Sequence, residues 1–193
     1  PASYGTWVPA SSPEKRRTSG RAVRFLFVGR DSVRKGLHHL LDAWRHAPAN
    51  AELRIVGEIA PIVRERYADV LNLPSVSPAG FQSGMEAEYR DADVAILPSL
   101  EEGDPIATYE AAAHGIPVIA SLPGAGRFGA ETGLVEIVEP LEIAVLRAAI
   151  HRFAGDEELR RDLGARSRAA SFAYDWSRVA PARFERLTAF LAR

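Results

Sequence analysis

The sequence predicts an α/β protein with an open parallel sheet, helices on both faces of the sheet, and a helical segment at its C-terminal end. Short apolar runs alternate with helical patterns, which is typical of a parallel sheet covered on both sides. The strands are expected near residues 23–28, 52–56, 76–81, 94–97, 117–120 and 134–138. The helices between them are expected near 35–47, 61–71, 84–91 and 105–114, and three consecutive helices near 141–154, 156–170 and 176–193.

The chain begins with a segment that lacks the character of a packed element. Pro1, Pro9 and Pro13 stand there among serines and the basic run 15–17, which suits a solvated interdomain linker over residues 1–22. The core is expected to begin at the first apolar run. Residues 23–193 are therefore expected to form one folded domain.

The first expected strand ends beside two basic side chains. Gly29-Arg30 follows the strand directly, and Lys35-Gly36 opens the next helical pattern. Asp31 or Ser32 could cap that helix, so that a helix N-terminus and two cations converge where a diphosphate would bind. Taken alone, Arg30 and Lys35 could equally be a solvated face, which is the usual fate of such residues.

Apolar spacing predicts which positions pack in two of the helices. Trp44 stands at helical spacing from the leucines of its helix, which predicts core packing rather than ligand contact. The helix near 141–154 is expected to bury the face formed by Leu141, Val145, Ala148 and Ala149.

The segment from Pro98 to Pro117 contains two carboxylates at the entrance of an expected helix. Asp104-Pro105 pairs a good N-cap with the residue suited to the first helical position, and Gly115 supplies a left-handed stop. A strand–helix–strand unit follows, with Glu102 in its loop and Glu110 one to two turns inside the helix. Open parallel sheets bind ligands at this edge, beyond the carboxyl ends of their strands.

Composition excludes several classes of protein. The 193 residues carry a net charge of −1, which argues against a general nucleic-acid binder. Cysteine is absent, so a disulfide framework and a thiolate metal site are excluded, and we expect no metal. Apolar stretches end well short of the roughly 20 residues needed to cross a bilayer. We expect a cytoplasmic protein, for which peripheral contact with a membrane stays open.

Short motifs occur in a fixed order along the chain. Glu102 and Glu110 form E-x7-E, residues 29–36 form G-R-x4-K-G, and residues 89–94 form Y-x-x-A-D-V. Further matching stretches lie at 55–57, 80–81, 115–121, 124–126 and 172–176. Together they resemble the C-terminal, donor-binding domain of the retaining glycosyltransferases of family four, in register over nearly the whole chain from about Tyr4. The resemblance implies a Rossmann-like domain that forms one half of a GT-B fold.

The resemblance also implies roles for the candidate residues. Arg30 and Lys35 would hold the donor diphosphate, Glu102 would lie against the donor sugar, and Glu110 would accept hydrogen bonds from the ribose hydroxyls. Gly103 and its neighbours would present backbone N–H groups to the ligand. We assign catalytic roles to Glu102, Arg30 and Lys35. We assign substrate binding to Glu110, Gly103, Asp104, Ile106 and Gly29.

The chain departs from the family pattern at Asp104-Pro105, where relatives commonly have small or apolar residues. A capping Asp104 would consume a helix N–H and place negative charge near the expected phosphate site, which would weaken donor binding. Alternatively, Asp104 contacts a sugar hydroxyl and helps to select the donor. The residues alone do not rank these two interpretations.

The sequence therefore predicts the donor domain of a retaining glycosyltransferase, with a nucleotide-diphosphate sugar as donor substrate and no other cofactor. Its acceptor is unknown. The family builds its active site between two domains, so we expect an N-terminal acceptor domain in the same or a separate chain, and no activity without it. The last helix, which in the family returns to that domain, is expected to expose an apolar face here. The alternative is a non-catalytic nucleotide-binding module with a regulatory or scaffolding role.

Overall fold

A computed structural model describes residues 5–10, 20–30 and 32–192. Six strands in this part of the chain form one parallel sheet with the order β3-β2-β1-β4-β5-β6. The strands are β1 (Val23–Val28), β2 (Ala51–Val56), β3 (Val76–Gly80), β4 (Val94–Leu97), β5 (Val118–Ala120) and β6 (Val135–Ile137). The predicted open parallel sheet is confirmed, and every strand lies where an apolar run predicted it.

One face of the sheet packs against helices from both halves of the chain. These helices are α1 (Leu37–Trp44), α2 (Pro61–Arg66), α3 (Ala68–Leu71) and α7 (Ile143–Gly155). Alternate residues of β1, such as Phe25 and Phe27, point into this layer because successive strand side chains face opposite sides. Trp44 is 1% exposed and lies edge-on to Phe25 with the ring centroids 5.5 Å apart, so the predicted core role of Trp44 is confirmed.

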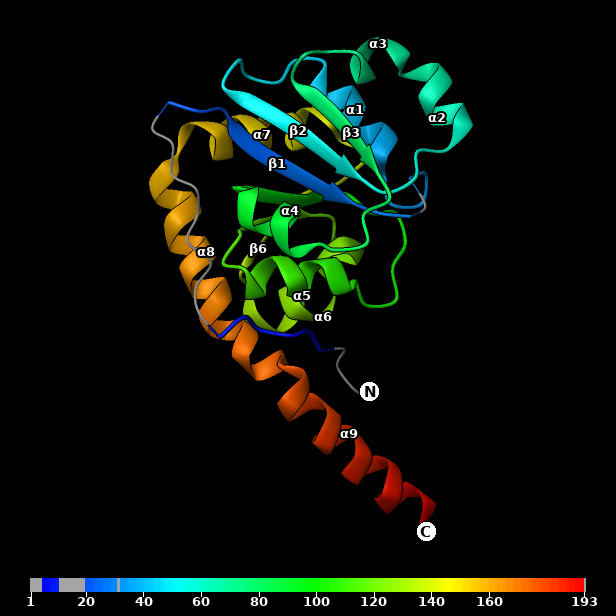
Figure 1. Ribbon diagram of the computed structural model, residues 1–193, viewed down its shortest axis with the longest axis vertical. Helices are drawn as coiled ribbons and strands as arrows, with labels where there is room; N and C mark the ends of the chain where they lie inside the picture. The colour runs from blue at the N-terminus through cyan, green and yellow to red at the C-terminus, as the bar shows by residue number, and fades with distance from the viewer. Residues whose placement is uncertain (1–4, 11–19, 31, 193) are drawn as a thin grey trace.

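The other face of the sheet packs against α4 (Glu86–Asp91), α5 (Ile106–Ala113) and α6 (Leu122–Thr132). Figure 1 shows these three helices grouped together, with α1, α2 and α3 on the opposite side of the strands. α5 is lined with alanines, which let it approach the sheet closely, and Ala111, Ala112 and Ala113 are fully buried. Helices thus cover both faces, as parallel sheets require.

The C-terminal part of the chain consists of α8 (Glu157–Ser171), the 3₁₀ turn η1 (Phe172–Tyr174) and α9 (Trp176–Leu191). Figure 1 shows α8 along the side of the domain that is opposite the carboxyl ends of β1 and β2, and α9 projecting away from the body. Thr6 pairs with Asp175 in an isolated parallel bridge, so residues near the start of the described chain lie beside the start of α9.

Three details of the helices differ from expectation. The segment of α6 was not predicted as a helix because its three glycines resemble a loop. The expected helix near 61–71 is divided at Tyr67 into α2 and α3. The buried face of α7 is formed by Leu146, Ala149, Ile150, Phe153 and Ala154. Of the expected face, Ala149 is buried, whereas Leu141, Val145 and Ala148 are exposed, because the helix begins at Ile143 and its rotation is set by packing on α1.

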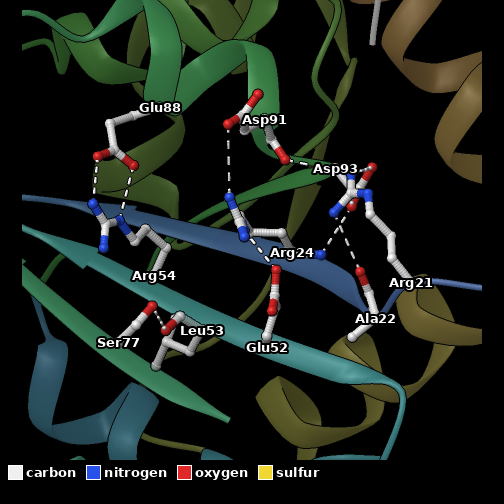
Figure 2. A network of polar contacts seen from close by, with 10 residues as sticks. All are labelled: Arg21, Ala22, Arg24, Glu52, Leu53, Arg54, Ser77, Glu88, Asp91 and Asp93. Carbon is white, nitrogen blue, oxygen red and sulfur yellow. Dashed lines mark hydrogen bonds and ion pairs between the residues drawn. The ribbon is translucent and has the colours of Figure 1, made fainter. Parts of the chain in front are cut away.

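A polar network covers part of the sheet face beneath α4, and Figure 2 shows its ion pairs. Arg54 on β2 makes two hydrogen bonds to Glu88 of α4, at 2.7 and 3.0 Å. Arg24 on β1 contacts Glu52 on the neighbouring strand at 2.6 Å. A pocket of about 130 Å³ lies here, lined by residues of the strands and α4 rather than by the loops at the carboxyl ends. This network joins α4 to β1 and β2.

Every helix in the described part of the chain is too short or too polar to cross a membrane.

Candidate functional site

The strand order places a topological switch point between β1 and β4. The chain proceeds from β1 to β2 and β3 on one side, then returns to pair β4 with the other side of β1. At such a point the loops after the two central strands diverge and leave a crevice, which is where open α/β sheets bind ligands. Here the two loops are residues 29–36 after β1 and residues 98–105 after β4. All three predicted catalytic residues lie in these loops.

Glu102 and Lys35 join the loop after β4 to the loop after β1. The Nζ of Lys35 donates to Oε1 of Glu102, and the hydroxyl of Ser99 donates to the same oxygen at 2.9 Å. The Nη1 of Arg34 lies 4.0 Å from Oε2 of Glu102. The Glu102 side chain is only 7% exposed, so this carboxylate is held by its neighbours rather than by water. The loop after β1 and the loop after β4 are thereby joined at the predicted site.

Glycines allow the two loops to approach this closely. Gly36 has a left-handed backbone with φ at 71°, and a Cβ there would lie 1.9 Å from the carbonyl oxygen of Pro98. A Cβ on Gly29 would meet the Cγ of Lys35 at 2.9 Å, so the stem of Lys35 packs over the bare backbone of Gly29. The backbone N–H of Leu100 donates to the carbonyl of Arg34 at 2.8 Å. The G-R-x4-K-G spacing therefore has a packing reason of its own.

Arg30 points away from Glu102. Its guanidinium carbon lies 5.8 Å from the ring centroid of Phe81, which follows β3. Phe81 is 70% exposed, and Arg30 is exposed as well. The two predicted diphosphate cations thus leave the same loop in different directions, with Lys35 toward the loop of β4 and Arg30 toward the loop of β3. Asp31, one of the two expected helix caps, lies outside the described residues.

Ser32 does not cap α1. Its hydroxyl accepts a hydrogen bond from the backbone N–H of Ala60 at 2.9 Å, and the residue preceding α1 is the left-handed Gly36. The expectation of a side-chain cap at Ser32 was wrong, because this serine is buried and ties the loop after β1 to the loop after β2.

Glu110 lies in the fifth position of α5 and is partly buried. Tyr89 of α4, which is 1% exposed, donates its hydroxyl to Oε2 of Glu110 at 2.7 Å. Burial and the neighbouring Glu110 raise the pKa of the Tyr89 hydroxyl well above its ordinary value, so it stays a proton donor. The partner that a partly buried Glu110 requires is therefore a tyrosine from the preceding helix.

His114 follows α5 as its C-cap residue. Its Nδ1 lies 2.8 Å from the carbonyl oxygen of Glu110, an acceptor, so Nδ1 carries the proton in this contact. The imidazole also stacks on the ring of Tyr89, with centroids 5.0 Å apart and an interplanar angle of 24°. Glu110, Tyr89 and His114 form one compact cluster.

Asp104 does not cap α5, which corrects the expectation from Asp104-Pro105. The helix begins at Ile106 with Pro105 before it, and no side chain caps it. Both carboxylate oxygens of Asp104 accept from the hydroxyl of Tyr109, at 2.9 and 3.0 Å, and Oδ1 also accepts from the backbone N–H of Arg127 at 3.1 Å. α6 is interrupted at Gly126, and the backbone N–H that follows the interruption donates to Asp104 in the loop before α5.

Gly103 and Ile106 lie at the surface of the loop and of the helix start. A Cβ on Gly103 would meet no atom within 4 Å, and Gly103 has no positive φ. Ile106 is 46% exposed. Neither residue is required there by the packing of the described residues. Both remain predicted substrate-binding positions.

The structure thus brings Lys35 and Glu102 together and places Gly29 beneath them. Glu110 stands in a separate cluster on α5, and Arg30 stands beside Phe81. Tyr89 belongs to the Y-x-x-A-D-V motif and Ser99 to the segment from Pro98 to Pro117. The sequence gave neither a role, since nothing in the local pattern shows that their hydroxyls reach Glu110 and Glu102. Within the described ranges, no group of three or more His, Cys, Asp or Glu side chains is arranged to hold a metal ion.

Comparison with known proteins is consistent with this arrangement. The D-inositol 3-phosphate glycosyltransferase of Nocardia farcinica is 31% identical over 188 residues, which is 95% of this chain and 37% of that protein. The sucrose-phosphate synthase structure from Thermosynechococcus elongatus superposes with a TM-score of 0.81 at 26% identity, covering 98% of this chain and 52% of that one. The Anabaena HepE structure in complex with UDP and glucose gives a TM-score of 0.77 at 22% identity, covering 88% and 49%.

The chain spans between 32% and 45% of the length of the curated relatives it matches. Its fold is that of one half of a GT-B glycosyltransferase. The sequence profile described as glycosyl transferases group 1 matches residues 22–156, which is more than half of the chain. This match includes both loops of the switch point and the whole of α5. The protein belongs to the group 1 glycosyltransferase family.

Proposed function

We propose that this chain binds the nucleotide-diphosphate sugar donor for a retaining glycosyl transfer, and that Lys35, Arg30, Glu102 and Glu110 form the donor site. The observation that carries the proposal is the contact between Lys35 and Glu102 at the switch point. A cation and a carboxylate are held there side by side, at the edge where parallel sheets bind nucleotides. The cation can bind the phosphate groups of the donor, and the carboxylate can accept hydrogen bonds from the sugar hydroxyls.

The proposed chemistry places each residue at one part of the donor. The bond between the anomeric carbon and the diphosphate oxygen breaks, and negative charge grows on the departing diphosphate. Lys35 and Arg30, once they contact the bound diphosphate, stabilise this charge. The acceptor hydroxyl attacks from the same face of the sugar, and its proton passes to the departing phosphate. Glu102 orients the sugar, and Glu110 holds the ribose of the nucleotide.

Lys35 is paired with Glu102, and this pair has a consequence for donor binding. A diphosphate that reaches Lys35 competes with the Glu102 carboxylate, which is 7% exposed. Arg34, at 4.0 Å from Glu102, stays beside the carboxylate when the Lys35 ammonium turns to phosphate. Arg34 then compensates the negative charge of the buried Glu102 carboxylate. Donor binding therefore rearranges the ion pair without leaving the carboxylate alone.

Titration calorimetry tests the donor site directly. UDP, GDP, ADP and their glucose or mannose conjugates are titrated into the protein and into Arg30→Ala and Glu110→Gln. Arg30 is exposed, and its contact among the described residues is with the exposed Phe81 ring, so its removal is expected to leave the fold intact. Loss of one charge-assisted contact is worth about 1.5–3 kcal/mol, which corresponds to roughly 10- to 150-fold in affinity. Both variants are expected to weaken binding of one nucleotide by that amount.

Arg166→Ala is the matched control, because Arg166 is an exposed arginine of α8, 61% exposed and paired only within its helix. Unchanged affinity in this control together with weakened affinity in both site variants supports the donor site. Absence of binding across the whole panel contradicts it. Transfer is then measured with the full-length protein and labelled donor, and the anomeric configuration of the product is read by NMR. Nucleotide binding without transfer would support a non-catalytic nucleotide-binding module.

A further inference from the structure

We propose that Tyr89 is a positioning residue for the nucleoside, which holds one oxygen of Glu110 and leaves the other free to accept from the ribose hydroxyls. The inference rests on the proposed function, because it concerns the same donor site. It adds a residue from α4 to a site otherwise built from the loops after β1 and β4 and from α5. It also predicts a measurable property, the discrimination between ribose and its deoxy analogues.

The Glu110 carboxylate can accept more hydrogen bonds than its protein partner supplies. A carboxylate offers about four acceptor sites on its two oxygens. The Tyr89 hydroxyl takes one of those on Oε2 at 2.7 Å, and within the described residues no protein donor reaches Oε1. Glu110 is partly rather than fully buried, so Oε1 is the oxygen left for a ligand. Two adjacent ribose hydroxyls are suitable donors for such an oxygen.

Tyr89 is held in place by its burial beneath α4. It is the buried residue of α4, and its backbone N–H donates to the carbonyl of Met85 at 3.0 Å. α4 leads directly into β4, and α5 follows β4, so both helices are fixed to the same strand. Figure 1 shows α4 and α5 on the same side of the sheet. The hydroxyl therefore reaches Glu110 from a rigid support.

His114 closes the cluster. Its imidazole stacks on the Tyr89 ring at 5.0 Å, and its Nδ1 donates to the backbone carbonyl of Glu110 at 2.8 Å. The side chain and the backbone of Glu110 are thus held from two directions. A glutamate has three rotatable side-chain bonds, and fixing them in advance lowers the entropy lost when a ligand is bound. This is the arrangement expected of a preorganised acceptor.

Two further tyrosines serve as internal references. Tyr109 donates to Asp104, and Tyr174 of η1 donates to Glu131 of α6 at 2.7 Å. Tyr174 is 7% exposed and belongs to the same core cluster as Tyr89. The Tyr174 pair has the same chemistry and the same length as the Tyr89 pair, but it does not include a predicted ligand-binding residue. Tyr174→Phe is therefore a matched control for Tyr89→Phe.

The experiment compares ribose with a sugar that lacks its hydroxyls. UDP, GDP and ADP and their 2′,3′-dideoxy analogues are titrated into the protein, Tyr89→Phe, Glu110→Gln, the double variant and Tyr174→Phe. Tyr89→Phe keeps the ring that stacks on His114 and removes only the hydroxyl. The protein is expected to prefer the ribonucleotide by about tenfold or more, the worth of a hydrogen bond to a charged group. Tyr89→Phe is expected to reduce this preference to about threefold or less.

The double variant shows whether the two residues act together. If Tyr89 acts through Glu110, Tyr89→Phe combined with Glu110→Gln is expected to discriminate no less than Glu110→Gln alone. Tyr174→Phe is expected to keep the full preference for ribose, while its melting temperature falls by an amount similar to that of Tyr89→Phe. A purely structural role of Tyr89 would lower the melting temperature without changing discrimination.

The outcomes separate this inference from the function on which it rests. Full discrimination in Tyr89→Phe, together with its loss in Glu110→Gln, overturns the role of Tyr89 and leaves the donor site standing. If Tyr89→Phe and Tyr174→Phe lose the preference for ribose equally, the role of Tyr89 is also overturned, because the effect would then be a general loosening of the core. If the unaltered protein binds none of the three nucleotides, the proposed function fails and the inference fails with it.

Discussion

Gly103 and Gly36 are both glycines of the switch-point loops, yet the surrounding protein needs only one of them. Gly36 is left-handed and faces the carbonyl oxygen of Pro98, whereas Gly103 has open space around the position of a Cβ. Packing does not require a glycine at position 103, so a requirement for glycine there would come from a bound molecule. The two positions therefore separate a folding requirement from a binding requirement.

Gly103→Ala is expected to change the free energy of unfolding by no more than about 0.5 kcal/mol and to weaken donor binding. A methyl group there keeps a sugar or phosphate from approaching the backbone N–H. Urea denaturation gives the first quantity and calorimetry the second. Gly36→Ala, the control, is expected to cost at least about 2 kcal/mol, because it adds backbone strain to a steric clash. Unchanged affinity in Gly103→Ala would remove Gly103 from the site.

Asp104 is the residue at which this chain departs from the family pattern, and its contacts explain what the departure does. Its carboxylate joins the site loop to the second half of α6 through the Arg127 N–H, and it accepts from the fully buried Tyr109. Burial raises the pKa of the Tyr109 hydroxyl, with the hydrogen bond to Asp104 as a second cause, so this hydroxyl stays a donor. In this structure Asp104 holds the loop that carries Glu102.

Asp104→Ala is expected to lower the free energy of unfolding by about 2–4 kcal/mol, because it leaves a buried hydroxyl and a backbone N–H without an acceptor. Urea denaturation measures the loss. Asp162→Ala is the comparison, since Asp162 is 62% exposed and paired only with Arg166 on the same helix; its cost is expected to stay within about 0.5 kcal/mol. Equal stability of the two variants would mean that Asp104 has no role in holding the loop.

Among the elements, α9 is the one that the rest of the described domain covers least. Val179 is buried near its start, whereas Phe184, Leu187, Phe190 and Leu191 are between 55% and 73% exposed. The expectation that the last helix exposes an apolar face is confirmed. Figure 1 shows the helix leaving the body, so its outer turns receive no tertiary support from the sheet. The attachment of α9 to the rest of the domain therefore depends on the first turn of this helix.

That first turn is held by Asp175, the N-cap of α9. Its Oδ1 accepts from the backbone N–H of Ser177 at 2.9 Å, and its Oδ2 accepts from the N–H of Val8 at 3.0 Å. Asp175 therefore joins the described N-terminal residues to the last helix. The hydrogen bond from the Ser177 hydroxyl, followed by that from the Val8 N–H, lowers the pKa of the Asp175 carboxyl below its ordinary value.

The stabilisation by Asp175 is expected to depend on acid pH. Because the folded-state pKa lies below the unfolded value of about 4, the contribution is complete above that pH and disappears as the pH falls through the folded-state pKa. Asp175→Ala is expected to cost about 1 kcal/mol at pH 7. Denaturation curves of both proteins between pH 7 and pH 2 measure the difference, which is expected to shrink below about pH 4. A constant difference across this range would contradict the assignment.

For the whole molecule, ligand binding and folding are linked. A nucleotide that binds only the folded protein raises the free energy of unfolding by about 2.7 kcal/mol at a concentration 100 times its Kd. We expect the selected nucleoside diphosphate to raise the melting temperature in proportion to the logarithm of its concentration. Arg30→Ala is expected to need a higher concentration for the same shift, and Arg166→Ala is not. A melting temperature independent of nucleotide concentration would contradict a folded-state donor site.

Local sequence was sufficient to predict the architecture, and it placed the proposed site residues in loops at one edge of the sheet. Apolar runs predicted each strand, since a buried strand is recognised from a few consecutive residues. Gly29, Lys35 and Glu102 follow two of these strands, which placed them in loops at one edge of the sheet. α6 escaped prediction because Gly126 interrupts it, and a glycine-rich segment is typical of a loop. The buried face of α7 was assigned correctly only at Ala149, because the expected pattern began at Leu141, two residues before the helix starts.

The sequence by itself determined the fold class, the order of the elements and the membership of Glu102 and Glu110 in one strand–helix–strand unit. Only the tertiary structure decided which side chains meet. Lys35 and Glu102 are 67 residues apart, Tyr89 and Glu110 are 21 apart, and Asp104 and Arg127 are 23 apart. Periodicity and capping patterns depend on neighbours within a few residues, whereas these contacts exist because the sheet brings distant loops and helices to one edge.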